Sequence, residues 1–130
     1  MNSYYVDTSV MVAIAFSEPN ASKYKQLLLS AEDVLSSYLL EAEFFSVIAR
    51  EKAASEIISY LDNVSFVIPS RTLKEEYKKV FQNGYCRGSD AFHIACALYL
   101  DPDSNDLLFL TADEQQRKVA LGVGFKAPKV

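Results

Sequence analysis

The chain has few cysteines, no long apolar run and no excess of basic residues, and each lack excludes a class of protein. Its two cysteines, Cys86 and Cys96, form no CxxC pair, so the sequence indicates neither a zinc site nor a disulfide framework, and we expect a reducing cytoplasmic compartment. The longest unbroken apolar run covers residues 10–16, far short of the roughly 20 residues that span a membrane. The first residues lack a basic start, which argues against a secretory or transit signal.

Acidic residues outnumber basic ones, 17 against 13, for a net charge of −4. The sequence therefore offers no broad basic surface for docking nucleic acid. If four carboxylates share one site, however, the rest of the chain is neutral, and a bound divalent cation would offset much of that site's charge. The acidic balance is thus only a weak argument against a nucleic-acid ligand.

Short β-rich runs alternate with helical patterns along the chain. No internal repeat, low-complexity tract or Gly/Ser-rich linker interrupts them, so we expect one domain over residues 1–130. Strands are predicted at residues 4–6, 34–36, 64–68 and 107–110, with a weaker fifth strand at 125–127. The runs are mostly continuous rather than alternating, which is typical of strands that are buried on both faces.

Helices are predicted between these strands, at residues 10–16, 21–29, 39–52, 55–61, 72–81, 90–100 and 113–121. Asn20 and Ser89 are expected to cap two of them, a capping box is expected from Thr72, and Gly122 is expected to end the last. Strands that alternate with helices favour right-handed βαβ units and a parallel sheet covered on both faces. The fold class is α/β.

Acidic residues recur where these strands end and where the helices return. Asp7 directly follows the first strand, and Asp113 closely follows the fourth. Asp90 opens a helix that leads into the fourth strand, while Glu41 and Glu43 lie early in the helix after the second strand. The carboxyl ends of parallel strands share one edge, and α/β sheets hold their ligands there.

The aspartates admit two interpretations. Taken singly, Asp7 and Asp113 suit helix caps, and Asp90 suits the first turn of a helix, where the dipole favours an anion. Taken together, two carboxylates about 5 Å apart repel by about 3 kcal/mol at an effective dielectric constant of about 20. A cation or a raised pKa must offset that repulsion. Oxygen donors without His or Cys partners suit Mg²⁺ or Mn²⁺.

Four blocks of the sequence resemble the PIN-domain ribonucleases, and more narrowly the VapC-type toxins of type II toxin–antitoxin systems. The blocks are YVDTSV at 5–10, EFFSVIAR at 43–50, RGSDAFHIA at 87–95 and LTAD at 110–113. They follow the family's order and span nearly the whole chain. The resemblance implies a PIN-like three-layer α/β/α sandwich with a short, mainly parallel central sheet of four to five strands.

By this resemblance Asp7, Glu43, Asp90 and Asp113 correspond to the family's acidic metal-binding quartet. Helical spacing alone does not choose between Glu41 and Glu43, and the resemblance selects Glu43. It implies a Mg²⁺- or Mn²⁺-dependent endoribonuclease that cleaves RNA in the cytoplasm, forms a homodimer and is held inactive by a cognate antitoxin. The alternatives are a PIN-like nuclease of RNA processing outside a toxin pair, and a non-catalytic PIN-like binding module.

Polar residues beside the blocks have supporting roles by the same resemblance. Thr8 and Thr111 correspond to hydroxyls that bind the acids or the waters of the metal. Arg87 suits either an RNA phosphate contact or support of the acids.

Three further expectations concern side chains without an assigned catalytic role. His93, the chain's single histidine, is expected to pack or to support the acids rather than to act as a general base. Arg50 lies two turns after Glu43 on the same flank of the helix and is able to hold that side chain in place. Several aromatic residues are candidates for a groove that binds a partner or for a homodimer face: Phe16, Tyr24, Tyr38, Phe44 and Phe45.

Overall fold

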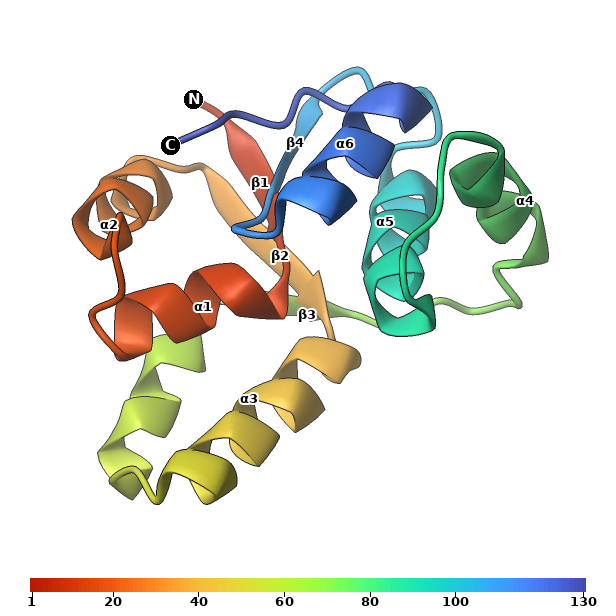
Figure 1. Ribbon diagram of the computed structural model, residues 1–130. Coiled ribbons are helices and arrows are strands. Elements are labelled where there is room, and N and C mark those ends of the chain that lie inside the picture. The colour runs from red at the N-terminus through yellow and green to blue at the C-terminus, as the bar shows by residue number, and fades with distance from the viewer.

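A four-stranded sheet lies between two layers of helices in the computed structural model, which describes residues 1–130 (Figure 1). The strands are β1 (Ser3–Val6), β2 (Asp33–Ser37), β3 (Ser65–Val67) and β4 (Leu107–Leu110), in the spatial order β3-β2-β1-β4. All three strand pairs are parallel. The predicted α/β class and three-layer arrangement are confirmed. None of the helices has the length and apolar character needed to cross a membrane.

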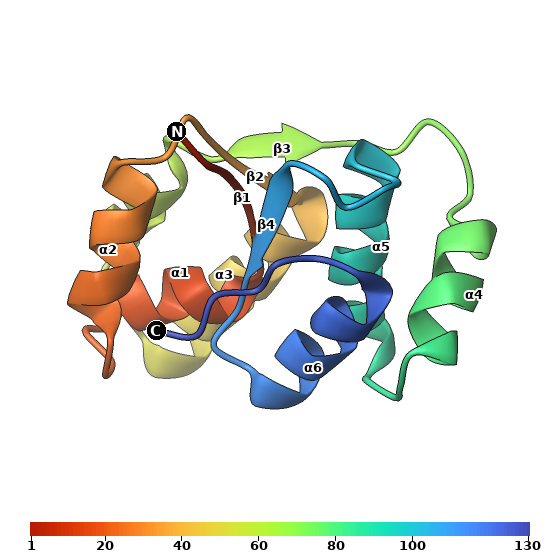
Figure 2. The ribbon, with the colours of Figure 1, turned by 90° about the horizontal axis from the view of Figure 1, so that it is seen from above.

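The helices divide between the two faces of the sheet (Figure 2). One layer contains α1 (Thr8–Ala15), α2 (Ala21–Leu29), α3 (Tyr38–Glu51) and a 3₁₀ helix, η1 (Ser55–Leu61). The other layer contains α4 (Lys74–Gln82), α5 (Gly88–Leu100) and α6 (Glu114–Val123). Because helices cover both faces, the strands are buried on both sides, as their continuous apolar sequences predict.

Successive side chains of β1 enter opposite cores. Tyr4 and Val6 pack with Val10 of α1 and the rest of the first helix layer. Tyr5 faces the other layer, where its ring stacks on Phe109 with centroids 5.5 Å apart. Burial of each large apolar side chain contributes about 1.5–3 kcal/mol, so these two cores hold β1 firmly in the middle of the sheet.

The neighbouring strands β1 and β4 send their chains to opposite faces, β1 into α1 and β4 into α6. A parallel sheet opens a crevice at such a point, beyond the carboxyl ends of the strands. Val6 pairs with Leu110 across the two strands, and the backbone N–H of Asp7 donates to the Leu110 carbonyl at 3.2 Å. Asp7 and Thr111 therefore leave the sheet side by side.

Two predictions near the C-terminal end of the chain are wrong, namely a fifth strand and the last residue of the last helix. The fifth strand at 125–127 is reduced to one parallel bridge between Leu108 and Lys126, because Pro128 follows and cannot extend a ladder of N–H donors. The last helix does not end at Gly122 but continues to Val123. It stops at Gly124, whose φ of 123° is a conformation that favours a residue without a Cβ atom.

The predicted caps at Thr72 and Ser89 are wrong, and the predicted cap at Asn20 is right in position only. The capping box at Thr72 does not form, because α4 begins at Lys74 with Leu73 in the cap position, one residue later than the box requires. Ser89 lies inside α5, because the carbonyl of the preceding Arg87 already accepts the first helical hydrogen bond. Asn20 flanks α2 as predicted, but its left-handed backbone leaves its side chain without a cap bond.

Candidate functional site

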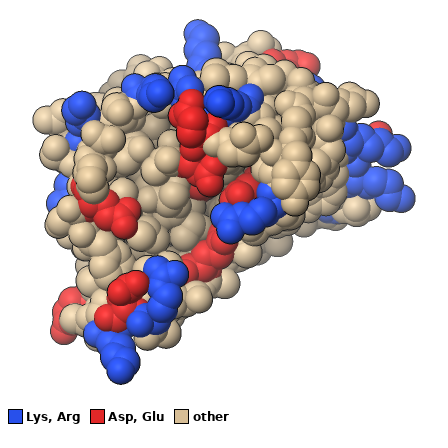
Figure 3. All heavy atoms as spheres, in the orientation of Figure 1, with Lys and Arg blue, Asp and Glu red and all other residues tan.

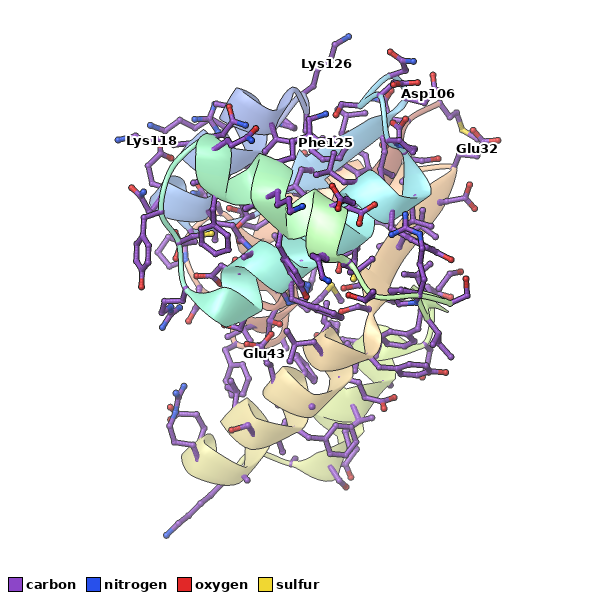
Figure 4. All side chains as sticks on the ribbon, turned by 90° about the vertical axis from the view of Figure 1, so that its right-hand side faces the viewer. Glu32, Glu43, Asp106, Lys118, Phe125 and Lys126 are labelled. Carbon is purple, nitrogen blue, oxygen red and sulfur yellow. The ribbon has the colours of Figure 1, made fainter.

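Glu43 is held at the start of α3 by side chains from two other elements. The Thr8 hydroxyl donates to Glu43 Oε1 at 2.6 Å, and His93 Nε2 lies 3.0 Å from the same oxygen. Burial raises the pKa of Glu43, but the hydrogen bonds from His93 and Thr8 outweigh burial, so that its pKa falls below the ordinary value. Glu43 is therefore an ionised carboxylate at neutral pH, and Figure 4 places it between α3 and α5.

Asp7 is the most buried of the four acids, with 4% of its surface exposed. Its Oδ1 accepts a hydrogen bond of 2.6 Å from the Ser9 hydroxyl, and it makes no side-chain cap for α1. Asp7 therefore occupies the N-cap position of α1, as predicted, but its side chain does not cap the helix. Burial raises the pKa of Asp7 from 3.8 to about 6, and the negative charge of Asp90 acts in the same direction, although the Ser9 hydroxyl opposes them.

Asp113 has the cap role that its position predicts. Its Oδ1 accepts from the backbone N–H of Gln116 at 2.9 Å, at the start of α6. The Thr111 hydroxyl accepts from the Asp113 backbone N–H and donates to Gln116 Oε1 at 2.7 Å, and Gln116 in turn donates to the Asp90 carbonyl at 3.1 Å. The fully buried Gln116 therefore joins the end of β4 to the first turn of α5.

Asp90 faces an exposed counter-charge rather than a buried donor. Arg87 Nε donates to Asp90 Oδ2 at 3.3 Å, with 75% of the arginine side chain exposed against 15% of the aspartate. This hydrogen bond is the main reason that the pKa of Arg87 is raised, and the charges of Asp113 and Glu43 raise it further. The guanidinium therefore lies within electrostatic reach of three of the four acids.

Arg50 does not take the role allowed by its position. Its Nε donates to the neighbouring Glu51 at 3.1 Å, on an exposed part of α3, so it does not hold Glu43. Glu41 is exposed, and Thr8 and His93 bond Glu43 instead. Of the two glutamates that helical spacing left open, Glu43 is the one held by Thr8 and His93.

The four acids come from four separate elements and gather at one edge of the sheet, which we call the carboxyl rim (Asp7, Glu43, Asp90 and Asp113). Figure 3 shows acidic side chains in a band down the face where these elements meet, with basic side chains beside them. Within the rim, no three His, Cys, Asp or Glu side chains lie close enough together to hold a metal ion in common. Each acid is instead paired with a hydrogen-bond donor.

Residues 4–121 match the family described as PIN domain. The chain belongs to the PIN domain family. No curated protein matches the chain. PIN domains are generally metal-dependent nucleases, and the family typically uses divalent metals.

The oxygen donors of this PIN domain suit a hard divalent cation. Each rim acid has one oxygen in a hydrogen bond, namely Asp7 Oδ1, Glu43 Oε1, Asp90 Oδ2 and Asp113 Oδ1. Mg²⁺ and Mn²⁺ prefer carboxylate oxygens, so the chemistry of the donors fits these cations, although the side chains do not form a closed set of ligands.

Two residues that hold the rim acids were missed by sequence reasoning. Ser9, which binds Asp7, was not distinguished from the rest of its block. Gln116 looks like an ordinary helical surface residue, but it stands three positions after a cap residue, as Glu or Gln does in a capping box. That spacing from Asp113 is the signal that could have found it.

The largest hollow of the PIN domain lies elsewhere, at the opposite edge of the sheet. It has a volume of about 650 Å³, and its charged lining residues are Glu32, Asp106 and Lys126 (Figure 4). These three side chains are exposed and form no ion pair. The size of a hollow therefore does not identify the site in this molecule.

Proposed function

We propose that this PIN domain is a Mg²⁺- or Mn²⁺-dependent endoribonuclease, and that its cation is held by Asp7, Glu43, Asp90 and Asp113. The observation that supports this proposal is that acids from four separate elements lie at one edge of the sheet, where Asp7 is only 4% exposed and its pKa is raised to about 6. Each carboxylate is held through one oxygen by a donor of the protein. Four carboxylates brought to one edge repel one another, and a bound cation offsets that repulsion.

A divalent cation at this rim supplies activation of a water molecule and neutralises charge on the phosphate. The chain's own residues prepare the place for it. Ser9 and Thr8 donate to one oxygen each of Asp7 and Glu43, which fixes the direction of both carboxylates. A neighbouring cation favours the ionised form of Asp7 and so opposes the effect of burial on its pKa.

Arg87 is the best-placed residue for contact with an RNA phosphate. Its side chain is largely exposed, and only one of its nitrogens donates to a rim acid. The remaining guanidinium N–H groups are free to bind phosphate oxygens. Because the chain has no broad basic surface, this single arginine at the rim favours local contact with a single-stranded or looped RNA over docking on a long duplex.

The proposed biological role is that of a cytoplasmic toxin whose partners are an antitoxin and a second copy of the chain. Of the aromatic side chains suggested for such an interface, Tyr24 and Phe44 are buried, whereas Tyr38 and Phe45 on α3 are about half exposed. The last two lie on the helix that carries Glu43. A partner bound over this exposed part of α3 would sit beside the rim.

A second candidate is a non-catalytic PIN-like binding module. One observation favours it, namely that no three rim carboxylates converge and Asp90 is already paired with Arg87. A nuclease outside any toxin pair has the same rim as the toxin, so the rim does not distinguish these two roles.

Cleavage of a mixed pool of single-stranded RNA in Mn²⁺ tests the nuclease proposal. We expect wild-type protein to cut the pool, EDTA to abolish cutting, and Asp90→Asn and Glu43→Gln to be inactive. Asp106→Asn, which changes an exposed acid at the far edge of the sheet, is the matched control and keeps full activity. RNA binding without cleavage in any divalent metal would replace the nuclease with the binding module.

Expression in a bacterial host tests the toxin role separately. We expect the wild-type chain to arrest growth and Asp90→Asn to permit it at equal protein level. A small protein encoded beside this chain should restore growth with the wild type. Cleavage in vitro without growth arrest would favour a nuclease of RNA processing.

A further inference from the structure

A buried chain of hydrogen bonds connects the core to the rim. The Tyr5 hydroxyl lies 2.9 Å from His93 Nδ1, and His93 Nε2 lies 3.0 Å from Glu43 Oε1. Tyr5 is fully buried and His93 is 1% exposed. The only histidine of the chain is therefore engaged through both ring nitrogens, one toward the core and one toward a rim acid.

For a neutral His93 imidazole, the donors and acceptors in this chain fix where the protons lie. An ionised Glu43 can only accept, and the single Thr8 proton is directed at Glu43 Oε1, 2.6 Å away, rather than at His93 Nε2, 3.5 Å away. His93 Nε2 must therefore carry a hydrogen to bond Glu43. In a neutral imidazole Nδ1 is then the acceptor, and the Tyr5 hydroxyl donates to it.

The surroundings of Tyr5 support this proton arrangement. Burial raises the pKa of Tyr5 well above its ordinary value, so the hydroxyl keeps its proton. The Tyr5 ring stacks on Phe109 and meets the His93 ring edge-on, with centroids 5.8 Å apart. Neither ring can turn without disturbing the core, so His93 presents Nε2 to Glu43 in a fixed direction.

We propose that Tyr5 and His93 are positioning residues, which hold Glu43 by its Oε1 so that Oε2 faces the rim. This inference rests on the proposed function, since Oε2 matters only if the rim binds a divalent cation. His93 acts here through Glu43 and does not serve as a general base, because both of its ring nitrogens are occupied. Thr8 supplies the second hydrogen bond to Oε1, so the carboxylate is held at two points.

Nitrogen-15 NMR of the imidazole tests the proton arrangement without any metal. With a single histidine, the spectrum contains one imidazole and needs no assignment. We expect the Nε2–H tautomer in the wild type and in Tyr4→Phe, and a changed Nδ1 signal in Tyr5→Phe. Tyr4 is the matched control, because it is a buried tyrosine of the same strand that packs in the other core. An Nδ1–H tautomer in the wild type would contradict the hydrogen-bond chain from Tyr5 through His93 to Glu43.

A melting titration with Mn²⁺ tests the effect on the rim. We expect His93→Leu to need about tenfold more Mn²⁺ than wild type for the same stabilisation, the effect usual for a residue that orients a metal ligand. His93→Gln should restore most of the affinity, because its amide nitrogen can replace Nε2 as the donor to Glu43. Tyr4→Phe should titrate as wild type.

The outcomes distinguish a failure of the positioning role from a failure of the proposed function. If His93→Leu melts lower without metal but binds Mn²⁺ like wild type, His93 is only a packing residue and the positioning role is wrong. If wild type itself shows no response to Mn²⁺, the cation site of the proposed function is wrong. The positioning role of Tyr5 and His93 toward that cation is then wrong as well. The NMR result then still decides whether the hydrogen-bond chain exists.

Discussion

Both edges of the sheet carry charged residues, but these residues are held by protein donors at one edge and exposed to water at the other. At the carboxyl rim, Asp7 is buried and each acid is fixed by a donor. The opposite edge, where the strands begin, is called the amino edge. Its hollow of about 650 Å³ is lined by Glu32, Asp106 and Lys126, which remain exposed and form no ion pair. Water solvates the second group, whereas the protein itself must solvate the first.

The difference has an energetic consequence. A carboxylate removed from water is destabilised unless hydrogen bonds or opposite charge replace the lost hydration. At the rim this replacement comes from Thr8, Ser9, His93 and the start of α6, and it is incomplete for Asp7, whose pKa remains raised. A fold keeps such an arrangement at a loss of stability, which is typical of a functional site.

Asp7→Asn is expected to have the largest effect on stability. The raised pKa implies that ionised Asp7 destabilises the fold by up to about 3 kcal/mol at pH 7.5, and asparagine removes the charge while keeping an oxygen that accepts from Ser9. We therefore expect a higher free energy of unfolding, measured by urea denaturation in EDTA. Asp106→Asn at the amino edge should stay within about 0.5 kcal/mol of wild type. A less stable Asp7→Asn would contradict the comparison.

The gain from Asp7→Asn depends on pH. The unfolded carboxyl loses its proton near pH 3.8 and the folded one near pH 6, so the contribution of Asp7 to stability is lost as the pH rises from about 4 to 6. Below pH 4 both states are protonated, and the variant should have no advantage. Unfolding curves of wild type and variant between pH 4 and 7.5 measure this window. A constant difference across it would exclude the raised pKa.

Gln116→Leu is expected to have the next largest effect, in the opposite direction. Leucine leaves the Thr111 hydroxyl and the Asp90 carbonyl without their buried partner, which costs about 2 kcal/mol. Ser104→Ala tests the amino edge, where the Ser104 hydroxyl is buried without a partner and its removal should cost nothing. Thermal melting of both variants measures the two changes in stability. Equal losses would mean that the two edges are held in the same way.

Arg87→Gln is expected to have a smaller effect, on metal affinity. The guanidinium adds positive charge beside Asp90, and its field reaches Asp113 and Glu43, so its removal should tighten Mn²⁺ binding on the order of a few-fold. Lys126→Gln, which removes a cation from the amino edge, should leave Mn²⁺ binding unchanged. Calorimetric titration compares the two. Weaker binding by Arg87→Gln would mean that the arginine supports the cation rather than competes with it.

The sequence predicted the elements well and their ends poorly. Strand and helix positions follow from apolar runs, which depend on burial and are visible in sequence. The caps at Thr72 and Ser89 were wrong, because the cap positions belong to Leu73 and Arg87, and cap propensity favours neither residue type.

At the rim, likewise, the positions of the acids were predicted better than their contacts. Acids at strand ends predicted that Asp7, Asp90 and Asp113 share an edge, since topology alone brings them there. The side chains that hold the acids were harder to predict, because Gln116 and Ser9 act through contacts between residues far apart in the chain, such as the Ser9 hydroxyl with the Ala112 backbone N–H. The supporting role left open for His93 became specific only with the direction of its two nitrogens.

The most direct test of the rim as a cation site is thermal melting of wild type and Asp90→Asn with and without millimolar Mn²⁺. A cation at a hundred times its Kd stabilises the folded state by about 2.7 kcal/mol, so the wild-type midpoint should rise by several degrees. Asp90→Asn should gain less, and without metal it should melt no lower than wild type, because repulsion among the acids is relieved. No shift of the wild type with Mn²⁺, together with a lower midpoint for Asp90→Asn, would contradict the account and leave Asp90 as a first-turn residue of α5.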